Sequence, residues 1–174
     1  MLNRTTAHLL AAIAIGLSFN ASAQTLWQKA SFGMTVAQVT FAFPKATSVR
    51  DGDALNTGAK ELLRESGVVL GGSEFEAQFF FNNQKLEQVT LKATEPRQFE
   101  LMISTFEQMR TLLRARYGRE LSSSIKSEPL LSKAEADWVV GKTNVSLFLL
   151  GIGQNPAVLN INYQVRMAKD AERL

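Results

Sequence analysis

The chain has 174 residues, with 19 lysines and arginines, 16 aspartates and glutamates, one histidine and no cysteine. His8, the only histidine, lies in an N-terminal segment with the features of a secretory signal, so the rest of the chain has neither histidine nor cysteine. This composition excludes Ser-His-Asp and Cys-His catalytic sites, the usual zinc sites and disulfide bonds. The small charge excess gives no reason to expect a nucleic acid or an acidic membrane surface as a partner, and we expect no cofactor.

The first 23 residues have the order of features that is typical of a cleavable signal peptide. Arg4 supplies a positive charge, residues 9–19 form an apolar run, and Ala21-Ser22-Ala23 has the small-x-small pattern that a signal peptidase accepts. The apolar run is shorter than the roughly 20 residues needed to span a bilayer, so a retained membrane anchor is the weaker alternative. We therefore expect cleavage after Ala23 and a single domain of residues 24–174, periplasmic or secreted, without stable membrane insertion.

The first predicted element after the signal is a short helix between Thr35 and Pro44. Thr35 and Gln38 have the spacing of a capping box, and Pro44 ends the helix because proline restricts the residue before it. Residues 47–59 are rich in loop-forming residues and predict a mobile surface segment. Asp51 and Asp53 resemble the front of a calcium loop, but Leu62 stands where that loop needs a glutamate, which favours a solvated loop.

Three strands are predicted next, over residues 68–70, 75–81 and 86–92. The last two flank Asn82-Asn83, an arrangement typical of an antiparallel hairpin. A second helix follows, because apolar residues recur at spacings of three and four from Phe99 to Tyr117. Four arginines gather near its end and suggest either an anion-binding patch or, as the simpler interpretation, a solvated face that complements the helix dipole. These arginines are Arg110, Arg114, Arg116 and Arg119.

Three further strands are predicted over residues 134–140, 145–150 and 159–165, followed by a charged tail of residues 167–174. Trp138 is expected inside the core rather than as a ligand platform. Each half of the domain, about 31–93 and 94–166, then contains one helix and three strands. We therefore expect an α+β fold in which two helix-plus-three-strand units form one antiparallel sheet, with both helices on one face and a possible internal duplication.

Alternation along these strands predicts which side chains occupy the open face of that sheet. Most of them are polar, but Phe80 and Phe148 place two aromatic rings among them. Aromatic anchors in a polar surround are typical of protein interfaces, whereas a covering loop or a shift of the alternation by one residue would bury them instead. The predicted binding residues are Phe80, Phe148, Asn160, Asn162 and Gln164. The other polar residues predicted on this face are Glu76, Gln78, Gln88, Thr90, Lys92, Glu135, Asp137 and Ser146.

The segment Phe32-Gly33-Met34-Thr35, followed by Val36, Val39 and Pro44, resembles the opening of the outer-membrane assembly lipoproteins of the small lipoprotein A type. The paired helix-and-strand layout, with Trp138-Val139-Val140 and Leu159-Asn160-Ile161, is also similar to the beta-lactamase-inhibitor-protein-like fold. Both resemblances imply a non-enzymatic periplasmic binding protein. The chain departs from them in having neither a cysteine for lipidation nor disulfides.

Two functions from different classes follow from these observations. The favoured one is a non-enzymatic exported binding or assembly module that uses the open face to bind another envelope protein. The alternative is a carboxylate-dependent hydrolase acting on an envelope glycan, for which Glu76 and Asp137 would have to face each other across a closed pocket. Ser132-Lys133 and Lys126-Ser127 suggest no catalytic dyad, because adjacent residues on a regular element do not face each other.

Overall fold

The computed structural model describes residues 24–166, so the predicted signal of residues 1–23 and the predicted tail of residues 167–174 lie outside the described residues. Ten strands and two helices follow one another along this part of the chain. In chain order they are β1 (Thr25–Trp27), β2 (Ala30–Ser31), α1 (Val36–Ala42), β3 (Thr47–Ser48), β4 (Lys60–Leu70), β5 (Ser73–Asn82), β6 (Lys85–Ala93), α2 (Phe99–Tyr117), β7 (Ser122–Lys126), β8 (Leu131–Val140), β9 (Thr143–Ile152) and β10 (Val158–Val165).

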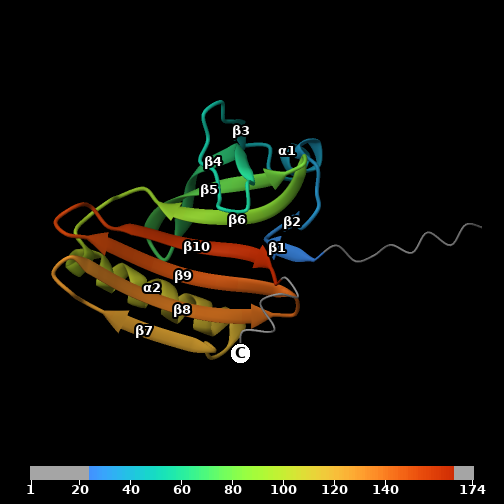
Figure 1. Ribbon diagram of the computed structural model, residues 1–174. Helices are drawn as coiled ribbons and strands as arrows, with labels where there is room; N and C mark the ends of the chain where they lie inside the picture. The colour runs from blue at the N-terminus through green and yellow to red at the C-terminus, as the bar shows by residue number, and fades with distance from the viewer. Residues whose placement is uncertain (1–23, 167–174) are drawn as a thin grey trace, which may run out of the picture.

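Eight of the strands form one antiparallel sheet in the order β3-β4-β5-β6-β10-β9-β8-β7, and β1 pairs separately with β2 (Figure 1). Strands β6 and β10 pair at the centre, with Tyr163 opposite Val89 and Asn162 opposite Thr90. The four strands that follow α1 form one half of the sheet and end at β6, and the four that follow α2 form the other half and begin at β10. The central pair joins the two halves of the domain into one continuous sheet.

The fold class expected from the sequence is wrong, although the sheet is antiparallel. Strands make up 50% and helices 18% of the described residues, and each helix is followed by four strands rather than three. Four strands were missed entirely: β1 and β2, which pair with each other, and the edge strands β3 and β7. Strand β3 has only two residues, and β7 consists of three serines, an isoleucine and a lysine. Neither edge strand has the apolar alternation that predicts a strand.

Strand β4 was also underestimated, because only residues 68–70 were expected in it. It begins at Lys60, and its first half carries charged residues that pair across the sheet with β5. Two irregularities interrupt the pairing, one between Glu61 and Leu63 and one between Glu65 and Val68. At the second of them Gly67 has a φ of 75°, a conformation that glycine adopts without steric cost. These bulges bend β4 and disturb the period-two pattern that sequence reasoning requires.

Helix α1 and the β1–β2 pair cover one half of the inner face of the sheet. The predicted capping box is confirmed. Thr35 Oγ1 accepts a hydrogen bond from the backbone N–H of Gln38, and Gln38 Oε1 accepts one from the backbone N–H of Thr35. Phe43, directly after the helix, lies 5.6 Å from Trp27 and 4.9 Å from Phe79 between ring centroids. This aromatic cluster joins the helix, the small strand pair and β5.

Helix α2 covers the other half of the inner face and packs on β8 and β9 (Figure 1). Its predicted apolar stripe is confirmed, because Phe99, Met102, Phe106, Met109 and Leu113 are all buried. Among the described residues, no helix is long and apolar enough to cross a membrane.

Trp138 is 2% exposed and donates from Nε1 to the Gly118 carbonyl oxygen at 2.9 Å, as expected for a core residue whose polar atom needs a partner. Two of the helix arginines form ion pairs: Arg110 with Glu107 at 2.6 Å, and Arg114 with Glu120. Paired charges of this kind favour the solvated-face interpretation of the arginine cluster over an anion-binding patch.

Candidate functional site: the open face of the sheet

The strand register places the predicted polar residues on the face of the sheet opposite the helices. Asn160 on β10 stands between Lys92 on β6 and Phe148 on β9, and the row continues through Glu135 on β8. Asn162 stands in the next row between Thr90 and Ser146. The alternation predicted for these strands is therefore correct, and Asn160, Asn162 and Gln164 lie in line along the central strand of the open face.

Phe80 belongs to this face, but the expectation that it is exposed is wrong, because only 2% of it is accessible. Residues 47–59 were expected to be a mobile surface loop, but residues 47–48 form β3 and residues 49–59 pack against the sheet here. The Asp53 amide donates to Glu61 Oε2 at 3.2 Å, and the Asp53 carboxylate accepts from Gln78 Nε2 at 3.3 Å. Lys92 adds an ion pair to Asp53 at 3.7 Å. Phe80 is the register partner of Glu61, so it is buried where this segment contacts the sheet and cannot serve as an exposed anchor.

A buried ion pair holds the same region together. Glu61 is 1% exposed and accepts two hydrogen bonds from Arg64, at 2.6 Å and 2.9 Å. The hydrogen bond to Glu61 is the main cause that raises the pKa of the Arg64 guanidinium above its usual value. A bidentate pair of this kind fixes geometry as well as charge. Sequence reasoning missed both residues because it placed them before the first expected strand of this region.

The carboxylates proposed for a hydrolase are not brought together. Glu76 lies on β5 and Asp137 on β8, four strand spacings away, which is roughly 19 Å at the usual distance between strands. Each also has its own partner: Glu76 accepts from Arg64, and Asp137 accepts from Ser122. A glycoside hydrolase needs its two carboxyl groups within about 5–9.5 Å, so this pair does not form such a site.

The other polar motifs singled out in the sequence have structural partners. Ser132 bonds to the Glu128 backbone and to Ser127, whereas Lys133 pairs with Glu135 at 2.5 Å, so Ser132 and Lys133 do not form a dyad. No cluster of three or more potential metal ligands occurs in the part of the chain that the structure describes.

Phe148, the second predicted anchor, remains partly accessible. Its ring lies 5.6 Å from the ammonium of Lys133, a cation–π contact, and Lys133 also pairs with Glu135. Hydrogen bonding to Lys133 is the main cause that lowers the pKa of the Glu135 carboxyl below its usual value. The ring is thus held in place by charged neighbours on one side of the open face.

Apolar side chains extend from Phe148 along the same face to the end of β9. Leu150 stands opposite Val158, and Ile152 stands opposite Leu131, all on the same face as Phe148. Leu131 is 51% exposed, Ile152 53% and Val158 40%. We call this set the β9 patch; its members are Leu131, Phe148, Leu150, Ile152 and Val158.

The patch was missed because β9 was predicted simply as a nearly all-apolar strand. The signal was present, since Phe148 and Leu150 alternate with the buried Leu147 and Leu149. An apolar strand covered on only one face must expose half of its side chains.

The amides beside the patch are only partly satisfied. Asn162 Oδ1 accepts from Thr90 Oγ1 at 3.0 Å, and Thr90 in turn accepts from Gln88. The buried Oδ1 atoms of Asn160 and Asn144 have no hydrogen-bond partner within residues 24–166. Gln164 is half-buried at the far end of the row. Asn160, Asn162 and Gln164 thus form a polar border along β10. Asn162 Oδ1 has a hydrogen-bond partner and Asn160 Oδ1 has none.

Comparisons with protein-family models, curated proteins and solved structures found no match. The resemblance to the assembly lipoproteins and to the inhibitor-like fold therefore stays an expectation from the sequence.

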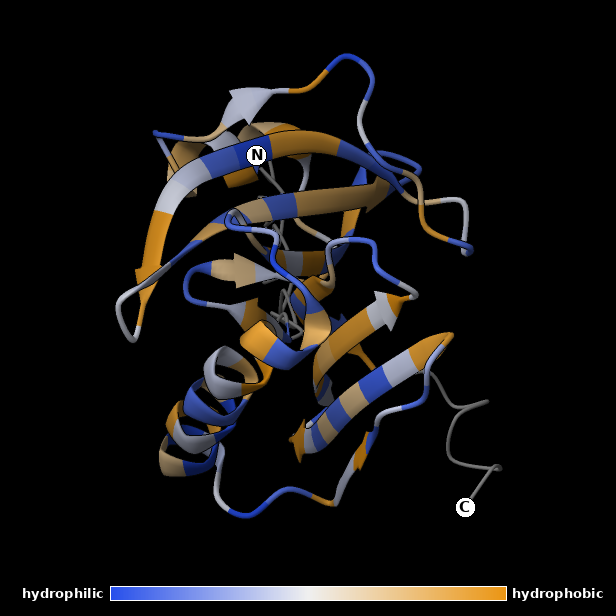
Figure 2. Ribbon diagram, turned by 90° about the vertical axis from the view of Figure 1, so that its left-hand side faces the viewer, coloured by the Kyte–Doolittle hydropathy of each residue, from blue (hydrophilic) through white to orange (hydrophobic). Residues whose placement is uncertain are grey.

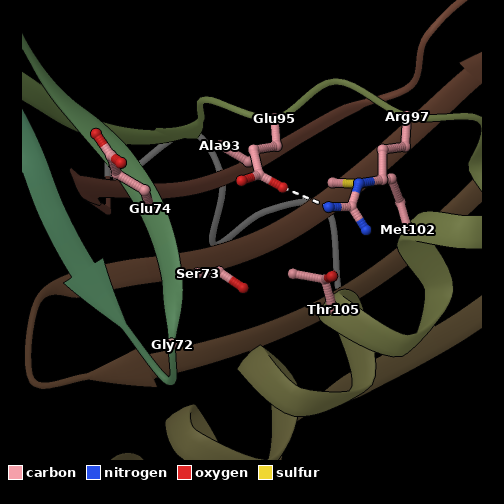
Figure 3. A pocket seen from close by; sticks show the side chains of 8 residues that line it. All are labelled: Gly72, Ser73, Glu74, Ala93, Glu95, Arg97, Met102 and Thr105. Atoms are coloured by element: carbon pink, nitrogen blue, oxygen red, sulfur yellow. Dashed lines mark hydrogen bonds and ion pairs between the residues drawn. The ribbon is translucent and has the colours of Figure 1, made fainter.

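Two shallow cavities lie near the ends of β5 and β6. One, of about 310 Å³, is lined by polar residues that include Glu74, Glu95 and Arg97 (Figure 3). Glu95 and Arg97 form an exposed ion pair at 2.5 Å. An exposed pair of this kind contributes little to stability, and it keeps the Glu95 carboxylate in contact with water. The other, of about 270 Å³, is lined by Lys92, Pro96 and Val158 among others, so it adjoins the β9 patch. The second cavity extends the open face as a hollow beside an apolar surface.

Proposed function

We propose that this chain is an exported, non-enzymatic binding module, and that the β9 patch on its open sheet face binds another protein of the bacterial envelope. The observation that carries the proposal is the exposure of the patch. Three of its five members are at least 40% exposed, on a face whose other strands carry polar side chains. Contiguous exposed apolar surface on a folded domain marks an interaction site more often than a scattered apolar residue does.

The surroundings of the patch fit a protein partner. Lys133 and Glu135 lie beside Phe148, and Lys92 and Asn160 continue the same row, so the apolar centre has a charged and polar border. Protein interfaces are commonly built in this way, with a desolvated aromatic or aliphatic centre inside a polar rim. The cavity next to Val158 gives a side chain of the partner a place to insert.

The envelope location rests on the sequence of residues 1–23 alone. We expect the exported protein to begin at Gln24, and an intact-mass measurement of the protein recovered from the envelope fraction tests this. A protein that keeps its apolar N-terminal run would contradict the location and would point to an anchored form.

Site-specific photo-crosslinking tests the binding surface. A photoreactive residue at Ile152, in the patch, is compared with one at Leu101, which is 61% exposed on α2 and lies outside the patch. We expect one defined adduct with an envelope protein from position 152 and none from position 101. Equal adducts from both positions, or adducts from neither, would contradict the proposal.

The identified partner is then purified and its affinity measured against variants of the patch. Ile152→Asp should weaken binding by about 2 kcal/mol, roughly thirtyfold, because it places a charge in the centre of an apolar contact. The melting temperature should change little, since the side chain is 53% exposed in the free protein. Unchanged affinity with Ile152→Asp would exclude the patch as the binding site.

A further inference from the structure

A third cavity, of about 300 Å³, lies on the inner face of the sheet, on the opposite side from the β9 patch. It is found where the two covering layers meet. Helix α2 forms one wall with Met109 and Leu112, Trp27 of β1 forms another, and the central strand β10 supplies the floor with Ile161 and Tyr163. The floor residues Ile161 and Tyr163 are 1% and 3% exposed, so the cavity is enclosed on this side by the sheet, and it lies between Trp27 of β1 and helix α2.

The β4–β5 hairpin closes the cavity from a third side. Figure 2 shows the hydrophobic end of β4 curving toward α2. The contact is tight at Gly71, whose carbonyl oxygen accepts from Gln108 Nε2 at 2.7 Å. A Cβ at Gly71 would lie 2.8 Å from Leu112, so the turn approaches the helix as closely as glycine permits. The hairpin end is therefore anchored on α2, and its residues Val69 and Leu70 line the cavity.

One cation lines this otherwise apolar cavity. Arg116 is exposed on the last turn of α2, where its guanidinium lies 5.4 Å from the ring centroid of Tyr117. The two other arginines of α2 pair with glutamates, but within residues 24–166 Arg116 has no carboxylate partner. A fourth cavity, of about 160 Å³, lies beside β1 and also includes Arg116. The charge is thus available at the border of the apolar space.

The phenol of Tyr163, on the floor of the cavity, does not add a charge to the site. Tyr163 is 3% exposed, and burial is the main cause that raises the pKa of its phenol, so the hydroxyl stays neutral at physiological pH. The site therefore combines an apolar lining with one positive charge. Ligand pockets typically join an apolar lining to a few polar groups that orient the ligand.

We propose that this cavity binds a single-chain carboxylate, with the hydrocarbon chain between α2, β10 and the β4–β5 hairpin and the carboxylate paired with Arg116. The volume corresponds to roughly ten water molecules, which suits a medium-length chain rather than a whole membrane lipid. The site is independent of the β9 patch, because the sheet separates the two.

Isothermal titration of the exported protein with decanoate and with decanol tests the proposal. We expect decanoate to bind at one site and to bind more tightly than decanol. Arg116→Gln should weaken decanoate by about fivefold, the effect of one solvent-accessible ion pair, and leave decanol unchanged. Equal loss for both ligands would show that Arg116 does not recognise the carboxylate, and no binding of decanoate would overturn the proposal.

Variants of the lining distinguish this cavity from other apolar surfaces. Leu112→Trp should block binding by filling the space, whereas Leu101→Trp on the same helix, outside the cavity, should leave it unchanged. Ile152→Asp in the β9 patch should also leave it unchanged. Binding that survives Leu112→Trp, or that is lost with Ile152→Asp, would place the ligand elsewhere and refute the assignment. Urea unfolding of each variant checks that it is folded.

Discussion

Replacing Phe80 by alanine separates the two interpretations of the open face, because an exposed anchor and a buried ring have different effects on stability. Phe80 is 2% exposed, and Gly52 and Asp53 of segment 49–59 lie against Glu61, its register partner on β4. Its side chain exceeds that of alanine by roughly 100 Å² of apolar surface, which corresponds to about 2.5 kcal/mol of lost burial. The cavity left behind adds to this, but the covering segment can move inward. We therefore expect a loss near the lower end of the usual range, about 3 kcal/mol.

Urea unfolding followed by far-ultraviolet circular dichroism measures this loss. With a slope of about 2 kcal/mol per molar urea, typical of a small domain, the midpoint should fall by about 1.5 M. Phe41→Ala is a matched control, since Phe41 is 90% exposed on α1 and should change the stability by no more than about 0.5 kcal/mol. A loss below about 1 kcal/mol for Phe80→Ala, or equal losses for both variants, would show that segment 49–59 does not cover the ring in solution.

Three further predictions concern other parts of the fold. Phe106→Ala should cost about 3–5 kcal/mol in urea unfolding, because the ring is fully buried in the stripe of α2; a small loss would mean that the helix packs differently. Gly52→Ala should cost about 1–3 kcal/mol, since its Cβ would lie 2.4 Å from the Glu61 carbonyl oxygen, and an unchanged midpoint would show that segment 49–59 gives way freely. Hydrogen bonding to Arg114 is the main cause that lowers the pKa of Glu120 from 4.5 to about 2. The ionised pair therefore stabilises the fold above pH 4.5 and loses this effect as the pH falls toward 2. The stability difference between the wild type and Glu120→Gln should disappear over that interval, and a difference that does not depend on pH would exclude the pair as its source.

The open face shows how far local pattern reasoning extends. Period-two alternation was sufficient to assign Gln78, Thr90 and Asn162 to one face, because side-chain direction in a strand follows from sequence position alone. It could not show that Phe80 is covered. That burial depends on Asp53 and the residues around it, which lie more than twenty positions away and carry only loop-forming signals.

The width of the sheet was likewise beyond local reasoning. Strand β7 forms because its backbone completes the hydrogen bonding of β8, with Ser124 opposite Glu135, and not because its side chains favour a strand. The same holds for the two residues of β3, which pair with Arg64 and Leu63. An edge strand is specified by its neighbour. When the edge strands are short and polar, as here, the sequence therefore predicts a sheet with fewer strands than the structure has.

By itself the sequence determined the elements that carry their own signals: the capping box of α1, the apolar stripe of α2, and the faces of β5, β6, β9 and β10. Only the tertiary structure decided which of the resulting surfaces stay accessible. The β9 patch requires β8, β9 and β10 to lie side by side, and the inner cavity requires the β4–β5 hairpin to reach α2. The physical reason is that periodicity sets the direction of a side chain, whereas burial depends on contacts between segments that are distant in the chain.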